Sequence, residues 1–121
     1  MLDIDEAALT LFFGELPKTQ DSEEAEFFGA KVWEVCRENL RLYVLFSTHD
    51  HEVSLTLYAD DNAKPTMESC VKLVSEVRIQ DRNNTLVLMG KAMRDAGSDP
   101  QLTERVRVTL NPLSVEVRES W

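Results

Sequence analysis

Hydrophobic residues recur at every second position in several parts of this 121-residue chain. Apolar side chains alternate with other residues over 40–46 and again over 53–58, and the polar segment 47–51 separates these two runs. Because successive side chains of a strand point to opposite faces, two such runs joined by a short polar segment predict a β-hairpin. The pattern recurs in two further pairs of runs: 77–80 with 85–89, and 105–110 with 115–117. Three hairpins therefore predict an antiparallel sheet.

Other segments show the helical period instead. Asp21-Ser22-Glu23-Glu24 fits a capping box, and the apolar residues after it fall on one face, so we predict an amphipathic helix over 22–38 that ends at Asn39. Residues 66–76 fit a second helix, although their β-branched content leaves a strand open. Residues 3–13 could form a short helix with Asp3 as its cap and Gly14 at its end.

These elements define an expected architecture. Helices alternate with hairpins along the chain, which is typical of an α+β domain: an antiparallel sheet with about two helices packed on one face. A length of 121 residues with 43% hydrophobic content suits one soluble domain over 1–121. Residues 1–21 form an acidic N-terminal segment that can be loosely packed.

Negative charge is concentrated near the N-terminus. The first 39 residues contain ten acids and three bases, a net charge of −7, whereas the other 82 contain twelve acids and ten bases, a net charge of −2. Such a distribution repels nucleic acid and anionic membranes, and it favours basic protein surfaces. The sequence thus predicts a basic protein partner, with neither nucleic acid nor membrane as a ligand.

The acids fall into two groups that could contact such a partner. Solubility and the helix dipole account for Glu23, Glu24 and Glu26 near the start of the predicted helix. They do not account for the other acids of the same stretch, which are Asp3, Asp5, Glu6 and Glu15. We expect a non-catalytic inhibitor or immunity-type protein that docks on a basic partner such as a toxin. The predicted partner-binding residues are Asp21, Glu23, Glu24, Glu26, Asp60 and Asp61.

Two other non-catalytic functions fit the composition. A secretion-chaperone-like protein would share the acidity, but such proteins usually end in a helix, whereas this chain is predicted to end in strands. A self-associating scaffold, for example a homodimer, would use Phe12, Phe13 and Phe27 as exposed apolar anchors.

Evidence for chemistry in the sequence is sparse. His49 and His51 could begin a metal site in a small metal-dependent enzyme, with Asp60 or Asp61 as a further ligand, but an exposed turn explains His49-Asp50-His51 more simply. No Gly-x-Ser-x-Gly or glycine-rich phosphate loop occurs. We therefore predict no catalytic residues, no metal and no cofactor.

The remaining expectations concern single residues and location. Cys36 and Cys70 fall on predicted helix stripes, which indicates buried free thiols, with a disulfide as the alternative. No apolar run is long enough to span a bilayer and no secretory signal is visible, which favours a cytoplasmic protein. Three arginines could form a basic stripe on the last hairpin or pair with neighbouring glutamates: Arg105, Arg107 and Arg118, beside Glu104, Glu116 and Glu119.

Overall fold

The computed structural model describes residues 2–19, 30–59, 64–80, 84–91, 102–110 and 112–117. One α-helix, a short 3₁₀ turn and nine strands lie within these ranges. In chain order they are α1 (Glu6–Phe13), β1 (Lys18–Thr19), β2 (Ala30–Arg37), β3 (Leu40–Ser47), η1 (Thr48–Asp50), β4 (Glu52–Ala59), β5 (Met67–Val71), β6 (Val74–Gln80), β7 (Thr85–Lys91), β8 (Leu102–Leu110) and β9 (Leu113–Val117).

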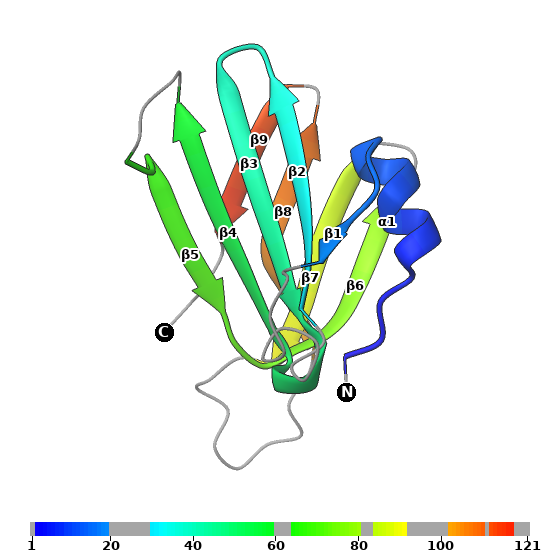
Figure 1. The fold of residues 1–121 in the computed structure, drawn as a ribbon. Helices are drawn as coiled ribbons and strands as arrows, with labels where there is room; N and C mark the ends of the chain where they lie inside the picture. The colour runs from blue at the N-terminus through cyan, green and yellow to red at the C-terminus, as the bar shows by residue number, and fades with distance from the viewer. Residues whose placement is uncertain are drawn as a thin grey trace.

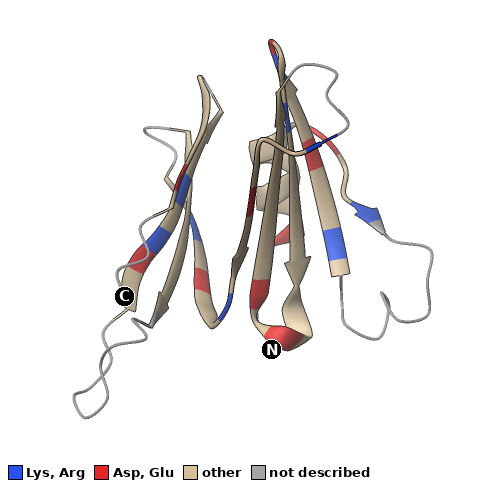
Figure 2. Ribbon diagram, turned by 90° about the vertical axis from the view of Figure 1, so that its left-hand side faces the viewer, with Lys and Arg blue, Asp and Glu red and all other residues tan. Residues whose placement is uncertain are grey.

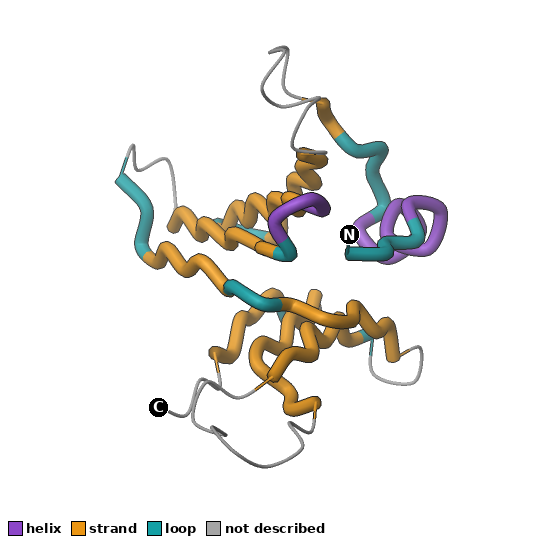
Figure 3. Tube along the Cα trace, turned by 90° about the horizontal axis from the view of Figure 1, so that it is seen from below, coloured by secondary structure: helices purple, strands orange, loops and turns teal. Residues whose placement is uncertain are grey.

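The strands form two antiparallel sheets that face each other. The first sheet has the order β1-β2-β3-β4-β5 and the second has the order β6-β7-β8-β9 (Figures 1 and 3). Every sheet neighbour is also a neighbour in the chain, so both sheets are meanders. Lys72 and Leu73 carry the chain from one sheet to the other, and the Val74 amide, 2.9 Å from the His51 carbonyl oxygen, donates a hydrogen bond that ties the second sheet to the first.

The core lies between the two sheets, where the alternating residues meet. Successive positions of β3 alternate between partly exposed and buried from Arg41 onward, as do those of β4 over Glu52–Thr56. This is the pattern of sheets with one face toward the core and the other toward water. The largest fully buried side chains of the strands are Trp33, Phe46, Leu42, Leu55, Leu86 and Leu88.

Helix α1 packs at one side of the sandwich, against β2 and β6 (Figure 1). The Asp5 side chain accepts a hydrogen bond from the Ala8 amide at 3.1 Å, and Gly14 ends the helix in a left-handed conformation, with φ of 77°. Leu9 and Phe13 are buried. The predicted helix at 3–13 is therefore confirmed, but its cap is Asp5 and not Asp3.

The prediction of a helix over 22–38 is wrong for its second half. Residues Ala30–Arg37 form β2 and pair with β3 along its whole length, with Trp33 opposite Val44. A spacing of three and four apolar positions fits a helix, but the β-branched and aromatic residues in this stretch also suit a strand. The pairing with β3 decides between them; residues 21–29 lie outside the described ranges.

The predicted helix at 66–76 is also wrong. Its residues belong to β5 and β6, so the strand that its β-branched content left open is what forms. The three predicted hairpins are confirmed as β3–β4, β6–β7 and β8–β9. The described chain is thus mostly β, with one helix in place of the expected two and with two sheets in place of one.

Candidate partner-binding surface

The outer face of the first sheet carries polar and aromatic side chains in register. Residues on this face are those that alternate with the buried set of β2 to β5. One row of register partners crosses four strands: Glu34 on β2, Tyr43 on β3, Thr56 on β4 and Glu68 on β5. We call this surface of the first sheet the outer face.

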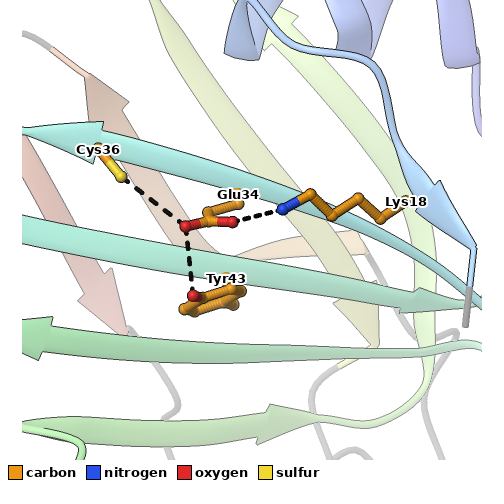
Figure 4. A network of polar contacts seen from close by, with 4 residues as sticks. All are labelled: Lys18, Glu34, Cys36 and Tyr43. Carbon is orange, nitrogen blue, oxygen red and sulfur yellow. Dashed lines mark hydrogen bonds and ion pairs between the residues drawn. The ribbon is translucent and has the colours of Figure 1, made fainter. Parts of the chain in front are cut away.

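A polar network occupies the β1 side of the outer face (Figure 4). The Glu34 carboxylate lies 2.7 Å from the Lys18 ammonium nitrogen and accepts a hydrogen bond from the Tyr43 hydroxyl at 3.2 Å. The Cys36 thiol lies 3.9 Å from the same carboxylate. The network attaches the two-residue strand β1 to the centre of the sheet through side chains as well as backbone.

The network changes the acidity of its members. The hydrogen bond from Lys18 lowers the pKa of Glu34, and the same bond raises the pKa of Lys18. Burial, followed by the charge of Glu34, raises the pKa of Tyr43. These shifts favour an ionised carboxylate, a charged ammonium and a neutral phenol at neutral pH, which keeps the network intact.

Two tyrosines and an arginine lie next to this network. The rings of Tyr43 and Tyr58 meet edge to face with centroids 5.7 Å apart, and the Arg41 guanidinium lies 5.1 Å from the centroid of the Tyr58 ring. All three side chains are partly exposed. Tyrosine and arginine are enriched among the residues that dominate binding energy in protein interfaces.

A hollow of about 360 Å³ lies between β4 and β5. Ser54, Thr56, Glu68 and Cys70 contribute their outward-facing side chains to it, and Leu55 and Ser69 complete its lining. The Glu52 carboxylate borders it, because its oxygen is 3.9 Å from the Cys70 sulfur. The hollow is therefore lined by hydroxyl, carboxylate and thiol groups on the partly exposed face of a sheet.

The predicted partner-binding residues Asp21, Glu23, Glu24, Glu26, Asp60 and Asp61 all lie outside the described residues. The described residues next to these two groups of acids lie at opposite ends of the first sheet. Ala30, which follows the first group, is the first residue of β2. Ala59, which precedes the second group, pairs with Leu40, and Leu40 pairs with the last residue of β2. With a rise of about 3.3 Å per residue, the two ends of β2 are roughly 23 Å apart. Contact of these acids with a partner stays a prediction.

The histidine pair lies in the turn between β3 and β4. His49 is part of η1, and His51 comes directly after it with a positive φ of 55°. Among the described residues, no three His, Cys, Asp or Glu side chains lie close enough together to hold a metal ion. The acids that were expected to complete such a site, Asp60 and Asp61, are not among these residues.

The expectation of buried cysteines is wrong. Cys36 and Cys70 are both exposed on the outer face, and both are free thiols, so the alternative of a disulfide is also excluded. The reason is the change from helix to strand: in β2 and β5 these positions alternate with the residues that face inward.

The predicted basic stripe on the last hairpin is wrong for Arg105. The register shifts between β7 and β8, with Leu88 opposite Val106 and Met89 opposite Glu104, so Arg105 is an extra residue in a β-bulge. The bulge turns Arg105 inward, where it is buried and donates a hydrogen bond to the Lys72 carbonyl.

The structure describes one of the other two arginines of the predicted stripe, Arg107. Arg107 pairs with Glu104 at 2.5 Å, which confirms the local ion pairing that was the alternative to a basic stripe. Arg118 and Glu119 lie outside the described residues.

The apolar anchors that self-association was expected to use are only partly available. Phe13 is buried against Trp33 and Phe12 is partly buried, while Phe27 lies outside the described residues. The exposed apolar residues of this region are instead Leu11, 85% exposed, and Leu16, 77% exposed. Leu11 also lines a second hollow of about 430 Å³ between α1 and the end of β6.

Charge on the described residues is distributed over both layers, with acidic and basic positions on each (Figure 2). In the part of the chain that the structure describes, no helix is long and apolar enough to cross a membrane. Sequence reasoning missed the outer face as a candidate surface, although the alternation of Arg41 and Tyr43 with buried residues already placed both on one side of a strand.

Comparison with known proteins identifies a shared fold. Neither protein-family models nor curated protein sequences gave a match. The structure does resemble that of a chain in the contact-dependent growth inhibition toxin–immunity protein complex from Klebsiella pneumoniae 342. The TM-score is 0.54 and the sequence identity 13%, over 85% of this chain and 94% of that chain. At this identity the likeness is one of fold, and it extends over nearly the whole of both chains.

Proposed function

We propose that this protein is a non-catalytic binding protein of the inhibitor or immunity type, which docks on a basic protein partner such as a toxin. The observation that carries the proposal is the fold shared with a chain of a toxin–immunity protein complex. Because a fold can host several functions, the proposal also needs support from the surface of this chain.

The charge of the chain supports a basic partner. A formal net charge of −9 on 121 residues produces a negative potential that speeds association with a cationic protein and orients it before contact. The acids Asp21, Glu23, Glu24, Glu26, Asp60 and Asp61 are the residues that we propose contribute most to this attraction. The tyrosines and arginine of the outer face supply the residue types that hold a partner after encounter.

Co-purification followed by a neutralisation assay tests the proposal. The tagged chain is expressed in cells of its source organism, and bound proteins are eluted with rising salt and identified by mass. We expect a stoichiometric basic protein that arrests growth when it is expressed alone and no longer does so when this chain is co-expressed. A partner that is acidic, or one that is harmless alone, would contradict the proposal.

Charge variants test the role of the acids. Replacing Glu23, Glu24 and Glu26 by Gln should leave folding nearly intact, slow association and weaken its dependence on salt. The matched control replaces three described acids elsewhere, Glu38 and Glu116 by Gln and Asp50 by Asn, for the same change in net charge. Equal association rates for both triple variants would show that only total charge matters.

Self-association is a second candidate function, which the exposure of Leu11 and Leu16 favours. A homodimer formed through this side of the molecule would bury both leucines and the hollow beside α1. Light scattering with size-exclusion chromatography measures the mass in solution. A dimer that Leu11→Ser converts to a monomer would support this function, and a monomer at all concentrations would exclude it.

A further inference from the structure

We infer that the hollow between β4 and β5 receives an arginine side chain of the protein partner. The inference rests on the proposed function, since it names the contact that the outer face would make with a basic protein. Three observations carry it: the groups that line the hollow, the carboxylates without a cation beside it, and the tyrosines next to it.

The lining of the hollow offers hydrogen-bond acceptors. Ser54 is the register partner of Cys70, and Thr56 is the register partner of Glu68, so two hydroxyls face a thiol and a carboxylate across the β4–β5 ladder. A guanidinium has five N–H donors and no acceptor, whereas hydroxyl and carboxylate oxygens can all accept. A volume of about 360 Å³ leaves room for the end of one long side chain.

The carboxylates at this hollow have no described lysine or arginine beside them, unlike three other described glutamates. Glu34, Glu76 and Glu104 each lie within 3 Å of a lysine or arginine nitrogen. Within the described ranges, Glu52 and Glu68 have no such cation, and the polar contact of the Glu52 carboxylate is with the Cys70 thiol, at 3.9 Å.

Two carboxylates therefore flank one hollow without an ion pair to the described chain. A cation supplied by a partner would neutralise them. Arginine fits better than lysine because its planar guanidinium can reach the carboxylate and the hydroxyls at once.

The aromatic residues extend the contact beyond the hollow. Thr56 has Glu68 of β5 as its register partner on one side and Tyr43 of β3 on the other. Tyr58 follows Thr56 by two residues in β4, so its side chain lies on the same face. A partner whose arginine enters the hollow would place its neighbouring side chains over this pair. Interfaces commonly combine a polar pocket with such aromatic anchors.

Titration of the full-length chain with acetyl-arginine amide tests the hollow directly. In ¹⁵N-resolved NMR spectra we expect the amide shifts to concentrate at Ser54, Thr56, Glu68, Ser69 and Cys70. Glu68→Gln should weaken binding of the probe by about two- to fivefold, the loss of one exposed ion pair. Glu15→Gln, which removes an exposed acid near the opposite edge of the sheet, is the matched control and should bind as the wild type does.

The outcomes separate the hollow from the proposed function. Shifts spread evenly over all acids, or a Glu68→Gln variant that binds the probe as tightly as the wild type, would overturn the inference. A probe that binds in the hollow of a protein that captures no toxin would support the hollow and contradict the function. Conversely, if Glu68→Lys captures and neutralises a toxin as well as the wild type does, the function stands and the arginine contact is wrong.

Discussion

The indole ring of Trp33 stacks on the ring of Phe13, with centroids 6.0 Å apart and an interplanar angle of 26°. Phe13 is the last residue of α1 and Trp33 lies in the middle of β2, so this pair fixes the helix to the sandwich. The Phe46 ring on β3 also meets the Trp33 ring edge to face, with centroids 5.4 Å apart. A fully buried tryptophan is therefore a main contact between the helix and β2.

Replacing Trp33 by a small residue should strongly destabilise the protein. Trp33→Ala removes the contact with both phenylalanines and leaves a cavity, so we expect a loss of about 3–5 kcal/mol in the free energy of unfolding. The indole N–H is buried without a hydrogen-bond partner among the described residues, so Trp33→Phe sacrifices no hydrogen bond there and should cost less. Urea denaturation measures both; equal costs would contradict the role of ring stacking.

The position of the helix cap gives a second prediction. Asp5→Ala removes the acceptor of the Ala8 amide and should destabilise the protein by about 0.5–2 kcal/mol. Asp3→Ala removes the same charge two residues earlier, where no capping bond is made, and is the matched control. If thermal denaturation shows the larger loss for Asp3→Ala, the cap is assigned to the wrong residue.

Gly90 should tolerate no side chain. An alanine Cβ there would lie 2.7 Å from Arg105 Cδ and 2.7 Å from the Leu73 carbonyl oxygen. We expect Gly90→Ala to destabilise the protein by about 1–3 kcal/mol. The cost should be smaller in an Arg105→Ala background, where half of the clash is gone; strict additivity in a double-mutant cycle would argue against this contact.

The network at β1 predicts a dependence on pH. The pKa of Glu34 is lowered in the folded state, so its contribution to stability is present above the usual carboxyl pKa of 4.5 and is lost as the pH falls through the lowered value. The Glu34→Gln variant should therefore be less stable than the wild type at neutral pH. At acid pH the two proteins should have the same stability, because the Glu34 carboxylate of the wild type is then protonated.

Denaturation midpoints measured from about pH 2 to pH 8 test the acid dependence. Glu38→Gln removes an exposed carboxylate with no hydrogen bond among the described residues, and it is the control. A constant difference between wild type and Glu34→Gln over this range would contradict the network.

The two thiols should react in the folded protein. Cys36 and Cys70 are exposed and free, so a thiol reagent such as Ellman's should modify both without denaturant. The single variants Cys36→Ser and Cys70→Ser assign the two reactions. A thiol that reacts only after urea is added would show that the corresponding strand presents its other face to solvent.

The hairpins could be predicted from the sequence because their information is local. Buried and partly exposed side chains alternate over residues 41–46 of β3 and 52–56 of β4, and the joining segment is short and polar. Residues 30–37 contain the same apolar residues that a helix would need, and what makes them a strand is the partner that lies across Trp33. That partner is Val44, and propensity alone cannot identify it.

The candidate surface was still harder to anticipate. Glu34 and Lys18 are sixteen residues apart, and they meet only because β1 pairs with β2. Arg105 was expected to point outward because strict alternation assigns it to the outer side, and a single extra residue in β8 reverses that assignment. Long-range register and bulges leave no local pattern in the sequence.

The two meanders also divide the molecule along its sequence. Every described strand pairing lies wholly before Lys72 or wholly after Leu73. A cut between these two residues would thus leave each ladder intact in one fragment, with its apolar face exposed. To reassociate, the fragments would need to re-form side-chain packing, the Val74–His51 backbone hydrogen bond and the contact of Arg105 with the Lys72 carbonyl, but no strand pairing. This makes the chain suitable for reconstitution from two separately expressed pieces.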